Sequence, residues 1–302
     1  MSRLAVVVLN WNGLDDTRAL LPTLARCRMP EGWEKTVLVV DNGSTDGSAV
    51  RLAAEFQDVE VLALPENLRF SGGNNQGLRR ALAAGADAVL LLNNDTEADP
   101  GLLERLLLAL EQDPDAGAAA PLIYFGPPSD RIWYAGGRCI VGLGHASHRG
   151  LRARDTGRYR RVEATGYLTG CCLLARREVW ERVGFLDERY HLYAEDADWS
   201  LRARAAGVRL LFVPTARLWH RVSASSGAAS PWKIYQRLRA NLTLFARHAK
   251  GPSRLTWLPA FLLQQAGLAG WLALRGRWAA AAAVPRALWD AGRGRPAAEV
   301  RP

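Results

Sequence analysis

Residues 88–96 have the sequence Ala-Val-Leu-Leu-Leu-Asn-Asn-Asp-Thr, an apolar run that ends in Asn93, Asn94 and Asp95. A strand that is apolar on both faces is typical of a parallel sheet covered by helices on both sides. In such a sheet, ligands bind beyond the carboxyl ends of the strands. Asp95 is therefore a candidate ligand for Mg²⁺ or Mn²⁺, which prefer oxygen ligands shared with substrate phosphates. The alternative interpretation is an ordinary turn and helix cap.

Short apolar runs alternate with longer helical stretches along the first 125 residues. They predict strands at 4–9, 36–40, 59–64 and 88–92, and helices at 15–28, 48–56 and 72–84. Further strands are predicted at 169–174 and 209–213, and further helices at 178–183 and 195–206. The pattern predicts an α/β fold with a mostly parallel central sheet and helices on both faces. Residues 121–165 are rich in Gly, Pro and Arg, and we expect irregular strands and loops that cover an acceptor site.

Two other polar clusters follow predicted strands. Asp41 begins Asp-Asn-Gly-Ser-Thr-Asp-Gly-Ser, where a carboxylate can accept a hydrogen bond from a base or ribose and the next helix start favours phosphate. A capping turn explains Ser44 and Asp46 equally well. In residues 67–75, Gly72 and Gly73 would let backbone approach a ligand, which alone is a weak signal.

The segment Glu-Asp-Ala-Asp-Trp at 195–199 places acidic side chains at a predicted helix start. One carboxylate there could deprotonate an acceptor hydroxyl, which is general-base catalysis. The alternative is that the acids only complement the helix dipole. His220 follows the last apolar strand, and it is either a structural residue or a neutral imidazole that completes a metal site.

Together these segments resemble glycosyltransferase family 2, which has the GT-A fold, and its rhamnosyltransferase-like branch in particular. The resemblance covers about residues 4–225 and is carried by the motifs at 8–13, 40–48, 67–77, 91–96, 169–180, 184–188 and 195–199, and by His220. It implies a nucleotide and donor site at Leu9, Asn10, Trp11, Asn12, Asp41, Gly73, Asn74, Asn93 and Asn94. It implies an acceptor site at Thr169, Gly170, Glu195 and Trp199.

The resemblance also implies a mechanism. Asn93 and Asp95 occupy the first and last positions of the family's Asp-x-Asp metal motif, so Asp95 becomes the main anionic ligand of Mg²⁺ or Mn²⁺, completed by His220 and diphosphate oxygens. Asp196 resembles the catalytic base of a single displacement that inverts the anomeric carbon. The donor would be a dTDP- or UDP-sugar, with rhamnose suggested by the branch. The acceptor would be a glycan or a polyprenyl-diphosphate-linked glycan.

The chain divides by charge into a catalytic domain at 1–225 and a basic, Trp-rich helical tail at 226–302, joined by a Ser/Ala/Gly linker at 223–230. The tail from residue 231 has 12 Lys and Arg against two Asp and Glu, while the whole chain is +9. Residues 255–274 are uncharged, and Trp257, Trp271 and Trp278 are expected near one helical face. We expect this helix to lie on a membrane surface; a membrane span and a packed or dimer-forming helix are alternatives.

Composition and motifs also bound the function. Because the first 230 residues are nearly neutral, a nucleic-acid partner is not expected. The segment 10–18 lacks the glycine-rich phosphate loop of a sugar nucleotidyltransferase, the enzyme alternative; a non-catalytic membrane-binding protein is the other. Segment 236–240, Gln-Arg-Leu-Arg-Ala, lacks the Trp of processive synthases, which favours single-sugar transfer. Four cysteines without zinc spacing and a short N-terminal apolar run predict buried thiols and a cytoplasmic enzyme on the inner face of the membrane.

Overall fold

The computed structural model describes residues 1–221 and 230–295. The first part of the chain alternates strands and helices: β1 (Ser2–Asn10), α1 (Leu14–Ala25), β2 (Trp33–Asp41), α2 (Ser48–Glu55), β3 (Val59–Ala63), α3 (Arg69–Ala83), β4 (Ala88–Asn93), β5 (Thr96–Ala98) and α4 (Leu102–Gln112). There follow β6 (Ala116–Phe125), β7 (Ile132–Tyr134), β8 (Gly137–Ile140), the 3₁₀ turn η1 (Val141–Leu143), β9 (His145–His148), β10 (Glu163–Ala164), β11 (Cys172–Arg176), α5 (Arg177–Val183), α6 (Glu195–Ala205) and β12 (Arg209–His220). The tail forms α7 (Pro231–His248), α8 (Ser253–Leu274) and α9 (Trp278–Gly292).

The central sheet has the strand order β10-β12-β6-β11-β4-β1-β2-β3, with β5 paired to β12 and β7 paired to β6. Strands β4, β1, β2 and β3 are parallel, and β11 is antiparallel to both of its neighbours. The register pairs Asn10 with Asp41 and Leu9 with Asn93. The polar residues that end three strands therefore meet at one edge of the sheet, as the sequence predicted.

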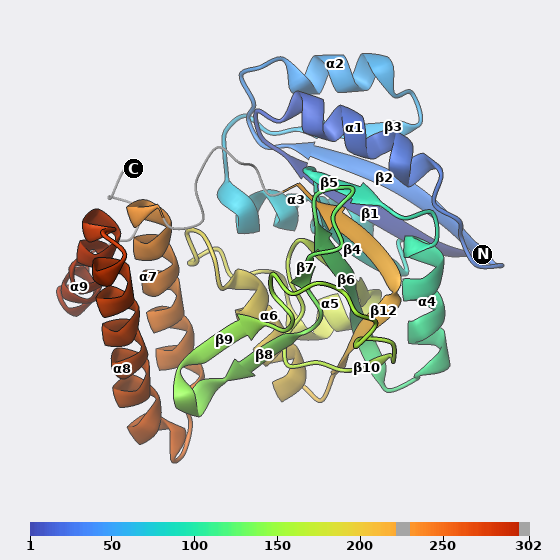
Figure 1. Cartoon of the computed structure of the whole chain (residues 1–302). Helices are drawn as coiled ribbons and strands as arrows, with labels where there is room; N and C mark the ends of the chain where they lie inside the picture. Colours follow the sequence, from blue (N-terminus) through green and yellow to red (C-terminus); the bar gives the residue numbers. More distant parts are fainter. Residues whose placement is uncertain (222–229, 296–302) are drawn as a thin grey trace.

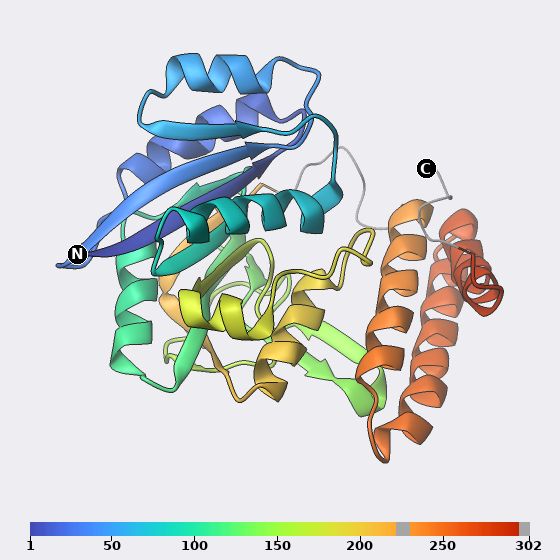
Figure 2. The same cartoon turned by 180° about the vertical axis from the view of Figure 1, so that it is seen from behind.

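Helices cover both faces of this sheet. In Figure 1, α1 and α2 lie together beside β2 and β3, and Figure 2 shows α3 on the opposite face. Helix α3 packs closely on β1 and β2 because Gly77 has no side chain: a Cβ there would lie 2.3 Å from Val7 Cγ1. This close packing fixes the N-terminal end of α3 near the polar edge of the sheet.

The predicted α/β fold is confirmed, but several boundaries differ. Segment 121–165 was expected to be irregular, yet β6 continues through residue 125 as a buried interior strand. Its small residues Ala118, Ala119 and Ala120 are fully buried between neighbouring strands, and small side chains gave no clear strand signal. The last strand is longer than expected because β12 reaches His220 through a bulge between Val213 and Arg217. Helices α4 and α9 were not predicted.

The three tail helices lie side by side and pack against the catalytic part of the chain (Figures 1 and 2). Tyr235, Phe245 and Phe261 of the tail share one hydrophobic cluster with Tyr167 and Tyr190. Helix α8 is also held to the β8–β9 hairpin by hydrogen bonds to its turn. The predicted linker at 223–230 lies outside the described residues except for Ser230, whose side chain caps α7 by accepting from the Lys233 backbone N–H.

The expected row of three tryptophans on one helical face is wrong. Trp257 and Trp271 lie on α8, but a turn at Gly276, where φ is +71°, separates Trp278 into α9. Trp257 packs against Phe245 and Phe261. Trp271 and Trp278 are 49% and 69% exposed, so two of these three tryptophans face solvent, as predicted. By length and composition α8 is the one described helix that could cross a membrane, and only 11% of its apolar window is buried.

Candidate active site

The predicted nucleoside pocket is built around a buried hydrogen-bond network at the ends of β1 and β2. Asn10 donates to Asp41 Oδ1 at 2.8 Å, and its own Oδ1 accepts from Thr17 and Asn94 at 2.8 and 3.2 Å. Ser44 also donates to Asp41. Asn10, Asp41 and Asn94, three of the predicted donor residues, therefore meet in one network, in which Asn94 also donates to the Gly13 carbonyl and the Thr17 hydroxyl.

Next to this network, a loop residue sets the shape of the pocket rim. Asn12 has φ +48°, its backbone N–H donates to Ser44 Oγ, and its Oδ1 accepts from the Thr45 backbone N–H at 2.7 Å. Asparagine tolerates this left-handed conformation better than most residues. The ring of the adjacent Trp11 is 56% exposed beside the buried network and is available to stack on a base.

Gly73 and Asn74 were expected near the donor phosphates. A Cβ at Gly73 would lie 2.5 Å from Leu9 Cδ1 and 3.0 Å from Asn42 Cγ, so this glycine permits contact between α3 and the protein's own pocket wall. Asn74 is buried and donates to the Phe70 carbonyl at 2.9 Å. The sequence predicted that a ligand approaches the backbone of Gly73; in the structure, the side chains of Leu9 and Asn42 make this approach.

The two predicted metal ligands face each other. His220 ends β12, which pairs with β5 so that His220 lies opposite Thr96, beside Asp95. His220 Nε2 is 3.0 Å from Asp95 Oδ1, and both side chains are largely buried. Trp133 packs edge-on against the imidazole, with ring centroids 4.6 Å apart. Asn93 ends β4, where its backbone N–H donates to the Cys171 carbonyl and its carbonyl accepts from the Thr96 hydroxyl.

The predicted catalytic base is held by the turn that leads into β11. The Gly170 N–H donates to Asp196 Oδ2 at 2.9 Å, and the Ala197 N–H donates to Asp196 Oδ1 at 2.7 Å. Thr169 lies in the same turn, where its hydroxyl accepts from the Cys171 N–H. A side chain at Gly170 would be tight, because a Cβ would lie 3.1 Å from atoms of the Phe70 ring.

Beside Asp196, Glu195 is 7% exposed, and its Oε2 makes no hydrogen bond in the described part of the chain. Burial raises the pKa of both carboxyl groups; the negative charge of Asp196 raises that of Glu195 further, while backbone N–H donors oppose the shift at Asp196. Perturbed carboxyls in a polar pocket are typical of acid–base sites. Glu195 and Asp196 are therefore candidates for acid–base chemistry.

The backbone just before these carboxylates is strained. Tyr193 and Ala194 both have φ +69°, a region that residues with a Cβ rarely adopt. Each such residue costs on the order of 1–3 kcal/mol, which surrounding contacts must offset. Tyr193 and Ala194 pack in or against the cluster shared with the tail, so the tail helps to hold this conformation. No local sequence pattern signalled it.

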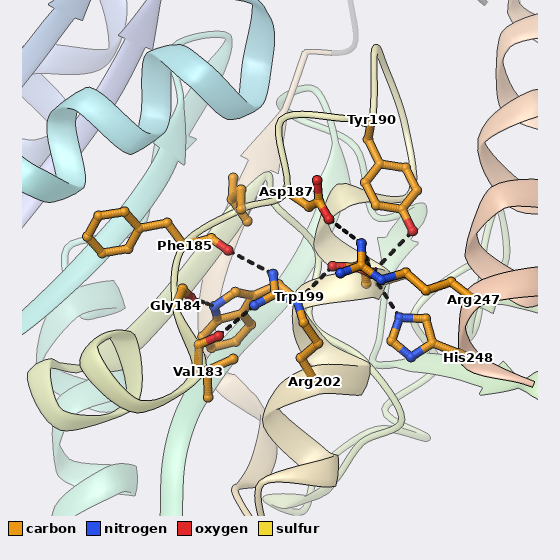
Figure 3. Close-up of polar contacts among 12 residues, drawn as sticks. Val183, Gly184, Phe185, Asp187, Tyr190, Trp199, Arg202, Arg247 and His248 are labelled. Atoms are coloured by element: carbon orange, nitrogen blue, oxygen red, sulfur yellow. Dashed lines mark hydrogen bonds and ion pairs between the residues drawn. The ribbon is translucent and has the colours of Figure 1, made fainter. Parts of the chain in front are cut away.

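The structure corrects the predicted role of Trp199. Its ring is fully buried against Trp180, with centroids 4.6 Å apart, and its Nε1–H donates to the Gly184 carbonyl at 2.9 Å (Figure 3). The ring packs on Trp180 of α5, on the side of α6 that faces the core. Trp199 therefore belongs to the core between α5 and α6.

Two features of the site were missed. Burial and then the charge of Asp95 raise the pKa of Asp16, which places an extra carboxyl of α1 near Asp95. The fully buried Asp198 joins α6 to the tail through His248 of α7, whose Nε2 lies 2.8 Å from Asp198 Oδ1, while Arg202 of α6 donates to Asp198 Oδ2 at 2.8 Å. The spacing of Asp198 and Arg202, four residues apart, predicts their contact. No sequence pattern indicated the contact with His248 of α7.

Comparison with known proteins identifies the family. The profile of glycosyl transferase family 2 matches residues 6–184. The chain belongs to this family. It is 33% identical over 211 residues to an N-acetylglucosaminyl-diphospho-decaprenol L-rhamnosyltransferase of Mycobacterium tuberculosis, a match that covers 64% of this chain and 68% of that protein. It is 31% identical over 231 residues to the O-antigen biosynthesis protein RfbC of Myxococcus xanthus, covering 72% of this chain and 17% of that protein.

The fold is also that of a solved glycosyltransferase. The mannosyltransferase PcManGT of Pyrobaculum calidifontis, determined in complex with GDP-Man and Mn²⁺, has a TM-score of 0.59 to this chain at 19% identity, covering 95% of this chain and 86% of that protein. The GT-A fold is thus confirmed, and the chain is a glycosyltransferase. Membership of the family decides against the sugar nucleotidyltransferase and the non-catalytic membrane protein.

Proposed function

We propose that this family 2 enzyme transfers a single sugar, with inversion, from a nucleotide-diphosphate-sugar to a hydroxyl of a lipid-linked glycan. The observation that carries this proposal is the hydrogen bond from the Gly170 N–H to Asp196 Oδ2. That hydrogen bond holds one carboxylate oxygen, and the buried setting raises the pKa of the group. A base held in this way is suited to take a proton from an attacking hydroxyl.

In the proposed reaction, the acceptor oxygen forms a bond to the anomeric carbon as the bond to the departing diphosphate breaks. Asp196 receives the hydroxyl proton, and the electron pair of the broken bond leaves with the nucleoside diphosphate. Because one displacement occurs, the configuration at the anomeric carbon inverts. Asp41, Asn10 and the exposed Trp11 ring hold the nucleoside, and the Thr169–Gly170 turn lies beside the acceptor.

A divalent cation fits the pair Asp95 and His220. A carboxylate oxygen and an imidazole nitrogen face each other 3.0 Å apart, and His220 Nδ1 hydrogen-bonds to nothing among the described residues. No cluster of three or more candidate protein ligands occurs among those residues, so donor diphosphate oxygens must complete the shell, as is common for Mg²⁺. When bound, the ion would neutralise charge on the departing diphosphate.

The donor and acceptor classes follow from relatives rather than from this chain. The mycobacterial relative is named for a rhamnose transfer to a decaprenyl diphosphate-linked sugar. By analogy we propose a dTDP- or UDP-sugar donor, with rhamnose as the first sugar to test, and a polyprenyl-diphosphate-linked acceptor. We further propose residues 1–225 as the catalytic domain and 226–302 as a tail that binds the cytoplasmic face of the membrane.

Asp196→Asn tests the catalytic assignment. We expect this variant to lose transfer by about 10³-fold or more, since it removes the base while preserving shape, and to bind the nucleoside diphosphate with unchanged affinity. The measurements are single-turnover transfer with a radiolabelled nucleotide sugar and calorimetric binding of UDP and dTDP. Ser71→Ala, near the site but without a hydrogen-bond partner, is the control. Near-normal turnover by Asp196→Asn would exclude this residue as the base.

Asp95→Ala tests the metal assignment. We expect Mn²⁺ to increase the thermal stabilisation that UDP or dTDP gives the wild type and to add nothing in the variant, since the anionic ligand is gone. His220→Ala should show an intermediate effect because it leaves the carboxylate. If nucleotide stabilised all three proteins equally with and without Mn²⁺, the reaction would not depend on this pair.

A further inference from the structure

A small cavity lies between the loop that precedes α6 and the middle of α7. Its volume is about 120 Å³, enough for a phosphate group, and it is lined by loop residues 189–192 and by one face of α7 that includes Arg239 and Thr243. Arg189 and Arg239 line it, and no carboxylate does. The cavity is therefore positively charged, which favours an anion.

Two nitrogen atoms at this place have no partner. Arg239 Nη1 and His191 Nδ1 are buried and make no hydrogen bond in the described part of the chain. The other Nη of Arg239 donates to the Arg295 carbonyl, so the guanidinium is anchored while its free edge remains available. Leaving a buried charged donor unsatisfied is unfavourable. An anion in the cavity would satisfy it.

The loop wall of the cavity is fixed in advance. Asp187 accepts from Arg189 and from Arg247 of α7, and the Tyr190 hydroxyl lies 3.2 Å from Asp198 Oδ1 (Figure 3). Asp198 is in turn held by His248 of α7. The loop is thereby bound both to α6 and to the end of α7, and a preorganised site loses little entropy when it binds a ligand.

We propose that this cavity binds a phosphate group of the lipid-linked acceptor, an inference that rests on the proposed function. The loop that forms one wall leads directly to Glu195 and Asp196, and the helix that forms the other wall leads to α8 with its exposed apolar side chains. A prenyl diphosphate sugar has the same order: a hydroxyl to be attacked, then the diphosphate, then the lipid. Arg239 is the principal cation for the phosphate, because the guanidinium of Arg189 is engaged by Asp187.

Binding of farnesyl diphosphate, a soluble prenyl diphosphate, tests the site in the full chain without any membrane. The donor site is first saturated with UDP and Mn²⁺. We expect wild-type protein to bind farnesyl diphosphate and not farnesol, and Arg239→Gln to weaken binding about tenfold or more, because a charge-assisted hydrogen bond is lost. Arg239→Lys should recover part of the affinity. Arg204→Gln, an equal loss of charge at an exposed position on α6, should bind as the wild type does.

Three outcomes would overturn the proposal. The first is equal affinity of wild type and Arg239→Gln for farnesyl diphosphate. The second is that Arg239→Gln reduces binding to phosphatidylglycerol vesicles but not to farnesyl diphosphate, which would assign the cavity to a lipid headgroup. The third is that Arg239→Gln transfers sugar with the same KM for the lipid-linked acceptor as the wild type. In that case the proposed function stands and the proposed site fails. Wild-type protein that binds farnesyl diphosphate through Arg239 but transfers no sugar would instead reject the proposed function alone.

Discussion

At the scale of single residues, the adjacent carboxyl groups Glu195 and Asp196 are the most unusual feature of the site. Asp196 accepts two backbone hydrogen bonds, while Glu195 Oε2 has none among the described residues. The two environments therefore differ although the residues are neighbours. Backbone donors favour the charged form of Asp196, and burial favours the protonated form of Glu195.

This difference predicts how stability depends on pH. Because burial raises the pKa of Glu195 above its ordinary 4.5, the folded protein binds more protons than the unfolded chain above pH 4.5, and stability from this group falls as pH rises toward the raised value. Glu195→Gln imitates the protonated form. We expect it to raise the melting temperature by about 2–6 °C at pH 8 and to change it little at pH 4.5. Thermal melts of both proteins across this range provide the measurement.

The comparison of wild type with Glu195→Gln also controls for the other ionisable groups. Other groups, such as the buried His148, whose pKa burial lowers to about 4, also make stability depend on pH. They are present in both proteins, so only the difference between the two curves reports on Glu195. Parallel curves would show that Glu195 ionises normally in the folded enzyme.

At the scale of elements, the position of α3 depends on a glycine, Gly77, that faces the sheet. At Gly77 an added Cβ would lie 2.3 Å from Val7 Cγ1 and 2.9 Å from Val40 Cγ2, both on interior strands. Such a contact would force α3 away from the sheet. The movement would also displace Gly73 from Leu9 and Asn42, which lie at the carboxyl ends of β1 and β2.

We therefore predict that Gly77→Ala destabilises the protein by about 1–3 kcal/mol, the usual result of overpacking a core, and weakens UDP or dTDP binding. The matched control is Gly267→Ala in α8, where nothing lies within 4 Å of the added Cβ. There, alanine should be neutral or stabilising by up to about 1 kcal/mol because it favours the helix. Urea unfolding measures both. Equal effects of the two substitutions would contradict the packing argument.

At the scale of the whole molecule, the tail is joined to the catalytic part and also exposed to solvent. Its inner side shares a hydrophobic cluster with Tyr167 and Tyr190, and Asp198 links α6 to α7. Its outer side presents Leu263 at 77% exposure and Leu274 at 90%. Arg275 stacks on Trp271, and Arg293 stacks on Trp289. Apolar and aromatic side chains flanked by arginines are typical of a helix in a membrane interface.

We predict that the protein binds vesicles containing phosphatidylglycerol and that binding weakens as salt concentration rises. The double substitution of Trp271 and Leu274 to Ser should reduce vesicle binding tenfold or more, because two exposed apolar groups no longer leave water. Val50→Ser, which alters an exposed apolar residue on α2, is the control. Vesicle flotation measures binding. Sedimentation tests the alternative that this surface binds a second copy of the chain. That alternative holds if the wild type is a stable dimer, the double variant is a monomer, and vesicle flotation is the same for both.

The sequence by itself determined the repeating strands and helices and the polar residues at the strand ends. These features depend on near neighbours: apolar runs such as residues 88–92 are buried in any parallel sheet, and the register of β1 with β2 and β4 then brings Asn10, Asp41 and Asn93 to one edge. The motifs that indicated glycosyltransferase family 2 are of the same local kind, and the family is confirmed.

Only the tertiary structure decided which distant groups meet. The facing of Asp95 and His220 depends on the pairing of β5 with β12, and the contact of Gly170 with Asp196 depends on how the β11 turn packs on α6. Trp199 lies in the core because of the side of α6 that faces α5, although its motif pointed to the acceptor. The physical reason is that burial and contact of residues far apart in sequence are set by the packing of whole elements, which no local pattern encodes.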